Sequence, residues 1–196
     1  MFANRYTALI DACVLVSAPR RDLLLTLAEA EFFRVRWSRN IISETQSALH
    51  NLFAERGYED PDTRAARAVA AMQTAFPEAL VDDQEGLQPL TFGLPDANDE
   101  HVLSAAVQTQ AQAIVTDNLA DFPAAILSPL NIEARTADDF IADTIALDEG
   151  KAVAAIRSMR VRLRRPEMLP QDFLKSLETN RLFVTASILS NHADSI

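Results

Sequence analysis

The 196-residue sequence has few of the residues that build several common kinds of functional site. Its one cysteine, Cys13, excludes an internal disulfide and a thiolate cage for zinc, and its three histidines are scattered along the chain. The sequence has only four glycines, and their spacing forms neither the phosphate-binding loop of an NTPase nor a dinucleotide-binding fingerprint. We therefore expect oxygen ligands around any metal, and neither ATP-driven nor NAD-dependent chemistry.

Long apolar runs are also missing. No stretch reaches the roughly 18 to 20 uninterrupted apolar residues that span a bilayer, and Asp11 interrupts the N-terminal apolar run. A secretory signal peptide would not carry that carboxylate. We expect a cytoplasmic protein with no membrane partner, and a chain of this length suits one compact domain with a small appendage.

Positive charge is scarce overall but locally concentrated. The net charge of -10 and the pI near 4.7 argue against a typical nucleic-acid binder, whose footprint is basic. Only Lys151 and Lys175 are lysines, and five arginines crowd one short segment: Arg157, Arg160, Arg162, Arg164 and Arg165. A chain can repel nucleic acid on average and still hold it at such a patch.

Short apolar runs alternate with helical patterns along most of the chain. Strands are expected at 6–10, 79–81, 113–116 and 131–136, and helices at 20–33, 38–57, 61–76, 94–110 and 137–147. Ser38 is placed as an N-cap, Thr136 with Asp139 resembles a capping box, and Asp138 is also assigned to capping. Strands separated by helices predict βαβ units and an α/β fold with a parallel sheet.

The composition shifts near Gly150. We predict a domain boundary there, with an α/β domain at 1–148 and a helical extension at 149–196. A basic helix to about Arg164, two prolines and a further helical pattern suggest that this extension is a helical hairpin.

Acidic residues follow two of the expected strands. Asp11 ends the first strand, and Asp117, Asn118 and Asp121 follow the strand at 113–116. Open parallel sheets bind ligands at the carboxyl ends of their strands, where the strand order reverses. These acids can therefore converge over one crevice.

Two more acids are directed inward by the periodicity of expected helices, Glu44 at the edge of an apolar stripe and Asp99 on an apolar face. Glu44 lies three residues after Ile41 and four before Ala48, and Asp99 lies three residues before Val102. An inward-facing carboxylate is costly unless its charge is compensated. Carboxylates that lie close together attract a hard cation, so we expect Mg²⁺ or Mn²⁺ at this site. With water as the nucleophile, a site that holds such an ion can cleave phosphodiesters.

Each acid also has an ordinary interpretation. Asp99 can complement a helix dipole, Asp11 can be a turn residue, and Asp117 or Asp121 can be loop polarity. Asp96 is either an N-cap or an acid behind the metal ligands. His101 is expected to be a surface or packing residue rather than a ligand.

Four ordered segments resemble one known family. They are "ALIDACVLVSA", the run from "RRDLLLTLAEAEFF" to "RWSRNIISETQSAL", "LPDANDEHVLSAAV" and "AIVTDNLADFP". Over residues 5 to about 145 they are similar to bacterial PIN-domain proteins, in the branch of VapC-like ribonucleases. The resemblance implies a three-layer α/β sandwich with a central parallel sheet and a magnesium-dependent endoribonuclease site.

The resemblance also assigns catalytic and metal-binding residues. The first three acids fall on Asp11, Glu44 and Asp99, and Asp121 is taken as the fourth. Many members have an aspartate two residues after the strand-end threonine, where this sequence has Asn118. Four residues are therefore kept as supporting or alternative ligands: Asp96, Thr116, Asp117 and Asn118.

The resemblance implies an RNA substrate and a cognate antitoxin protein, and leaves a homodimer open. Arg157, Arg160 and Arg164 recur at helical spacing, so this face can grip RNA phosphates beside the acidic crevice. It can equally be a solvated face that pairs with the chain's own acids.

The residues also bear on three other kinds of protein. A non-catalytic PIN-like binding module is kept open by Asn118. A phosphoacceptor receiver domain would need a lysine near its last strand, whereas both lysines fall in the C-terminal region. A haloacid-dehalogenase-type phosphatase would need an aspartate where Cys13 stands.

Overall fold

The computed structural model describes residues 6–81, 91–164 and 167–196. Its sheet has four parallel strands in the order β2-β1-β3-β4, and Leu9 of β1 pairs with Arg36 on one side and Ile114 on the other. The strands are β1 (Thr7–Ile10), β2 (Arg34–Arg36), β3 (Ala113–Val115) and β4 (Glu133–Arg135). The expected α/β class with a parallel sheet is confirmed.

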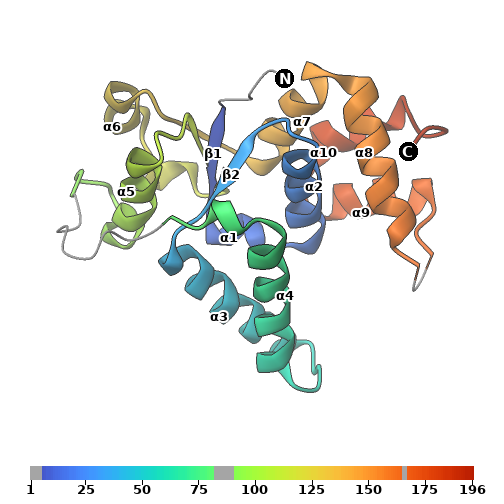
Figure 1. Cartoon of the computed structure of the whole chain (residues 1–196), viewed down its shortest axis with the longest axis horizontal. Helices are drawn as coiled ribbons and strands as arrows, with labels where there is room; N and C mark the ends of the chain where they lie inside the picture. The colour runs from blue at the N-terminus through green and yellow to red at the C-terminus, as the bar shows by residue number, and fades with distance from the viewer. Residues whose placement is uncertain (1–5, 82–90, 165–166) are drawn as a thin grey trace.

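Helices flank the sheet on both sides (Figure 1). On one side lie α5 and α6, on the other α2 and the helices from α7 onward, while α3 and α4 extend together from one end. The helices are α1 (Ala12–Leu15), α2 (Ala18–Glu29), α3 (Arg39–Glu55), α4 (Pro61–Ala75), α5 (Glu100–Gln108), α6 (Ala124–Leu127), α7 (Ala137–Leu147), α8 (Glu149–Arg162), α9 (Pro170–Thr179) and α10 (Phe183–Ser190), with short 3-10 turns η1 (Pro77–Ala79), η2 (Ala97–Asp99), η3 (Leu119–Asp121) and η4 (Ser128–Leu130).

Local capping chemistry fixes several helix starts. The Oγ of Ser38 accepts the N–H of Ile41 at 3.2 Å, and Oγ1 of Thr136 accepts the N–H of Asp139 at 3.1 Å. Both caps satisfy N–H groups that an α-helix leaves without an internal partner. The two caps predicted from the sequence are confirmed.

Three expected elements differ in the structure. The strand at 79–81 is wrong, because Pro77 starts the η1 turn and only Leu80 forms a single bridge, to Trp37. The helix expected at 94–110 begins only at Glu100, after the η2 turn. The hairpin expected after residue 149 has a break near Arg181, which has a left-handed φ of 61°, so three helices form instead of two. Arg165 lies outside the described residues.

The last three helices share the hydrophobic core of the rest of the chain. Ile156 of α8, Leu177 of α9 and Leu189 of α10 are fully buried in the same cluster as Leu23 and Ile141. In this cluster α8 packs against α2, and α10 packs against α7. The division into domains at 1–148 and 149–196 stays a prediction. In the described ranges, every helix is too short or too polar to cross a membrane.

Candidate metal centre

Asp11 lies where the strand order reverses. β1 sits between β2 and β3, so the chain leaves β1 toward one side and returns on the other, which opens a crevice at the carboxyl ends of β1 and β3. The N–H of Asp11 donates to the carbonyl of Val115 at 3.0 Å, which ties the end of β1 to the end of β3. Asp11 is only 8% exposed.

Two neighbouring side chains hold the Asp11 carboxylate. The Thr116 hydroxyl donates to its Oδ2 at 2.8 Å, and the Cys13 thiol approaches the same oxygen at 2.9 Å. Desolvation of the thiol and the charge on Asp11 raise the pKa of Cys13 to about 12. The thiol therefore stays protonated near neutral pH and donates to the carboxylate.

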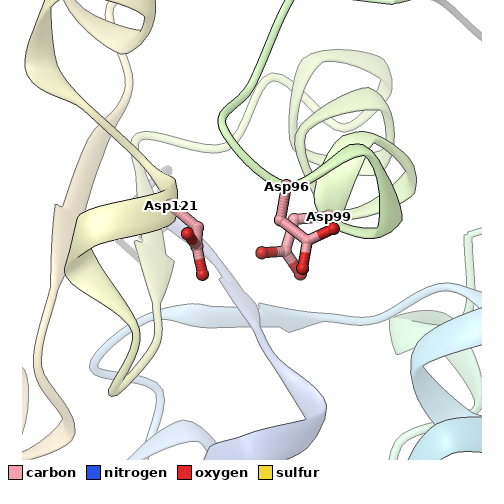
Figure 2. A group of neighbouring side chains, drawn as sticks. All are labelled: Asp96, Asp99 and Asp121. Atoms are coloured by element: carbon pink, nitrogen blue, oxygen red, sulfur yellow. The ribbon is translucent and has the colours of Figure 1, made fainter.

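Three further carboxylates form what we call the acidic cluster: Asp96, Asp99 and Asp121. One oxygen from each lies within 4.8 Å of the others. Asp96 and Asp99 come from the segment that leads into α5, and Asp121 faces them from η3 (Figure 2). Residues from two separate parts of the chain thus bring three hard oxygen donors together.

The segment that carries Asp96 is held by Glu100. The Glu100 carboxylate accepts the N–H groups of Phe92, Gly93 and Leu94 at 2.7, 2.7 and 2.9 Å. Burial acts to raise the pKa of Glu100, but these three hydrogen bonds outweigh it and the pKa is lowered. Asp96 in turn accepts the N–H of Asn98 at 2.8 Å and so begins η2.

Asn118 supports Asp121 from within its own turn. The Asn118 side-chain amide donates to Oδ2 of Asp121, and its backbone N–H donates to Oγ1 of Thr116 at 3.1 Å. Asp117 faces elsewhere, because its carboxylate forms an ion pair with Arg20. Of the three alternatives for the fourth acid, the structure places Asp121 in the cluster, with Asn118 beside it.

Negative charge is crowded in this region. Burial raises the pKa of Asp99, the charges of Asp11, Asp121 and Asp96 add to the rise, and His101 acts in the opposite direction, so that the pKa is about 6. Such a carboxyl group keeps its proton into the weakly acidic range, and once ionised near neutral pH it adds to a repulsion that a bound cation would relieve. Perturbed acids in a crevice mark a candidate functional site.

Glu44 lies apart from the acidic cluster. It is in the second turn of α3, its side chain is 48% exposed, and its Oε1 lies 2.8 Å from Nε2 of His101 on α5. His101 is two residues after Asp99, so this one imidazole connects Glu44 to the segment that carries the cluster. The expected inward orientation of Glu44 is therefore wrong: its carboxylate is half-exposed and reaches the segment of the cluster only through His101.

Comparison with known proteins identifies the family. Residues 7–120 match the family model of the PIN domain. The chain belongs to the PIN-domain family. Residues 137–191 match the model of the VapC50 C-terminal domain, so the extension beyond the PIN domain also has a counterpart. Both matches confirm the resemblance seen in the sequence.

A curated relative points the same way. The Mycobacterium tuberculosis protein named Putative ribonuclease VapC50 is 40% identical over 79 residues, which is 40% of this chain and 47% of that protein. The chain thus spans about half the length of the curated relative it matches. No solved structure matches.

The structure does not bring the predicted arginine face to the PIN-domain acids. Helix α8 packs on α2 and lies at the opposite end of the molecule from α5 (Figure 1). The guanidinium of Arg160 donates to the carbonyl of Met168, whereas Arg157 and Arg164 are exposed. The expected position of Arg157, Arg160 and Arg164 beside the crevice is therefore wrong, because the helix packs its apolar face against α2.

Sequence reasoning missed the supporting roles of Glu100, His101 and Arg20. A signal for Glu100 was its place directly after Asp99, in the first turn of a helix. The sequence indicates a surface or packing role for His101, although this residue stands two positions from a candidate ligand. Nothing local to Arg20 marks it, since its partner Asp117 is far away in the sequence.

Proposed function

We propose that this PIN-domain protein is a metal-dependent endoribonuclease that hydrolyses RNA phosphodiester bonds, and that it is the toxin of a toxin–antitoxin pair. The observation that carries the proposal is the acidic cluster at the carboxyl ends of β1 and β3, where neighbouring acids raise the pKa of Asp99. The match to the PIN domain and a relative named as a ribonuclease support it.

The residues of the cluster fit a hard divalent cation. Opposite ligands of a six-coordinate Mg²⁺ lie about 4.2 Å apart, twice the metal–oxygen distance. The three carboxylate oxygens already lie within 4.8 Å of one another, so small side-chain movements suffice. Asp96, Asp99 and Asp121 would hold Mg²⁺ or Mn²⁺, with Asp11 adjacent and Glu44 joined through His101.

When bound, such an ion makes water a nucleophile near neutral pH and stabilises charge on the leaving oxygen. The chain itself supplies fixed acceptors. Thr116 and Cys13 hold Asp11 in one orientation, and Asn118 holds Asp121. Side chains that are already oriented lose little freedom when they act, which is how a preorganised site stabilises developing charge.

The alternative of a non-catalytic PIN-like module depends on Asn118. In the structure this side chain donates to Asp121, which itself faces Asp96 and Asp99. An asparagine that orients a carboxylate within the site supports an enzyme rather than a degenerate site. We therefore favour the nuclease.

The proposal extends to partners. An antitoxin that inserts an arginine would neutralise the same carboxylates, because a guanidinium fork matches carboxylate geometry. The exposed Arg157 of α8, and Arg164 two residues after the end of that helix, could contact only an RNA long enough to reach across the molecule. Arg160 is proposed to be structural.

The test is an RNA cleavage assay with Mg²⁺ or Mn²⁺, compared with EDTA. Asp11→Asn keeps the side-chain size and removes the charge, so we expect it to abolish cleavage while the fold, followed by circular dichroism, is unchanged. Asp172→Asn, at an exposed acid in α9, is the matched control and should cut like wild type. Equal rates in Asp11→Asn and wild type, or cleavage in EDTA, would refute the proposal.

A further inference from the structure

Arg20 joins the segment after β3 to the C-terminal helices. It lies in the first turn of α2, its Nη1 donates to Oδ2 of Asp117, and its Nε donates to the backbone carbonyl of Asn180 at 3.0 Å. The Arg20 side chain is only 12% exposed, so the guanidinium is held from both sides. One arginine thus connects three parts of the chain that are far apart in sequence.

Hydrogen bonds hold the Asn180 end of this connection. Asn180 follows α9 as its C-cap, and its side-chain amide donates to the carbonyl of Ser176 at 2.8 Å. That bond turns its Oδ1 toward the Ser17 hydroxyl, which donates to it at 3.1 Å. Ser17 stands at the N-cap position of α2 but makes no side-chain cap there. The start of α2 is therefore bound to the end of α9 by two hydrogen bonds, from Ser17 and Arg20.

The Asp117 end of the connection leads to the acidic cluster. The N–H of Asp117 points at the sulfur of Cys13 at 3.4 Å, and the next residue, Asn118, bonds both Thr116 and Asp121. Only four positions separate Asp117 from Asp121, and hydrogen bonds fix both ends of this stretch. A movement of Asp117 would therefore be passed on to Asp121.

We propose that Arg20 is a positioning residue of the metal centre: through it, the end of α9 fixes residues 117–121 and keeps the Asp117 carboxylate directed away from the acidic cluster. The inference rests on the proposed nuclease function and gives the VapC50-like C-terminal region a part in the site. Without Arg20, an unpaired carboxylate would stand on the same short segment as Asp121. Loss of a residue that orients metal ligands costs about 10- to 100-fold in metal affinity or activity.

The test compares Arg20→Gln with Arg21→Gln in the full chain. Arg21 is the matched control, because it lies on the same helix turn and is also partly buried. Its Nη1 instead donates to the Leu15 carbonyl at 2.8 Å, and its Nε forms an ion pair with Asp22. We expect Arg20→Gln to weaken Mn²⁺ binding, measured by calorimetry, and to lower kcat by about tenfold or more with little change in KM. Amide hydrogen exchange at 117–121 in the metal-free protein should also become faster. Arg21→Gln should leave Mn²⁺ binding, kcat and this exchange unchanged.

A comparison of Arg20→Gln, Asp117→Asn and the double variant tests whether Arg20 acts through Asp117. If it does, Arg20→Gln/Asp117→Asn is no worse than Arg20→Gln alone, because the carboxylate that Arg20 restrains is gone; groups in contact show such non-additivity. The inference would be overturned if the fold-losses of the two single variants simply multiply in the double variant. It would also be overturned if Arg20→Gln behaves like Arg21→Gln.

Folding and the proposed function are controlled separately. If Arg20→Gln fails to fold, Arg20→Lys replaces it, since lysine keeps the charge but cannot hold two partners with one planar fork. Arg20→Lys should show a smaller loss in the same direction, and wild-type values would count against the role. If the wild-type protein neither binds Mn²⁺ nor cuts RNA, both the proposed function and the role of Arg20 are wrong. If the wild type is active but amide hydrogen exchange at 117–121 is unaltered in Arg20→Gln, only the role of Arg20 is wrong.

Discussion

The crowding of negative charge affects Asp99 directly. Its pKa is raised from 3.8 to about 6 by burial and by the neighbouring acids. The folded state therefore binds a proton more tightly than the unfolded state between about pH 4 and pH 6. In that window the contribution of Asp99 to the free energy of unfolding falls as the pH rises, and above pH 6 the full loss persists.

The prediction concerns the metal-free protein in EDTA. Asp99→Asn cannot ionise, so its stability advantage over wild type should grow from pH 4 to pH 6 and then level off. Urea unfolding of both proteins at several pH values measures this difference, in which the other titrating groups cancel. A difference that stays constant from pH 4 to pH 7 would show that the Asp99 carboxyl is not perturbed.

At the residue scale, the strand ends could be predicted and the side-chain partners could not. Asp11 and Asp121 follow from the rule that parallel strands present their carboxyl ends at one edge. Glu44 was placed correctly on its helix, but its partner is His101, and a partner on another helix leaves no trace in local spacing. The same holds for Arg20 and Asp117.

At the element scale, Asp138 connects α7 to α10. Its two carboxylate oxygens accept the N–H groups of Val184 and Thr185, each at 2.8 Å. Leu182, at the N-cap position of α10, cannot cap the helix itself. An acid from another helix thus takes the place of a missing local cap.

We expect Asp138→Ala to lower the free energy of unfolding by about 1–2 kcal/mol, the usual cost of removing an N-cap. Urea denaturation gives the value. Asp172→Ala, at an exposed acid in the first turn of α9, should change stability far less. Equal losses in the two variants would mean that the contacts from Asp138 to α10 contribute nothing specific.

Sequence patterns predict a helix or turn correctly where residues adjacent in the sequence determine it. Ser38 and the Thr136–Asp139 pair were found because a cap and its helix are adjacent in sequence. Asp138 was also assigned to capping, but the helix that it caps begins at Phe183. Residues 79–81 are apolar enough for a strand, yet Pro77 imposes a 3-10 turn and leaves only one bridging residue.

At the scale of the whole molecule, α8 lies at the opposite end from α5, whose N-cap residue Asp99 belongs to the acidic cluster (Figure 1). The predicted RNA contact can therefore involve only long substrates. Arg157→Gln/Arg164→Gln should weaken the binding of a long single-stranded RNA and reduce the slope of log affinity against log salt by about 1.4, since each phosphate contact contributes about 0.7. Cleavage of a short oligonucleotide should be unaffected, and an unchanged salt slope on long RNA would remove α8 from the binding surface.

The position of α8 could not be predicted because it depends on tertiary packing. Ala152, Val153 and Ile156 mark a buried face in the helix, but the sequence does not say which surface covers it. In the structure α2 does, and this turns the arginines away from the crevice. The helical nature of residues 149–196 was predicted, whereas their common core with the α/β part was not.

The central claim is that the acidic cluster holds a divalent cation. Calorimetric titration of Mn²⁺ into the metal-free protein at pH 7.5 tests it most directly, with wild type, Asp99→Asn and Asp117→Asn measured side by side. Wild type should bind Mn²⁺, Asp99→Asn should lose most of this affinity, and Asp117→Asn, whose carboxylate pairs with Arg20 rather than joining the cluster, should retain much more of it. No binding by wild type, or equal binding by wild type and Asp99→Asn, would contradict the claim.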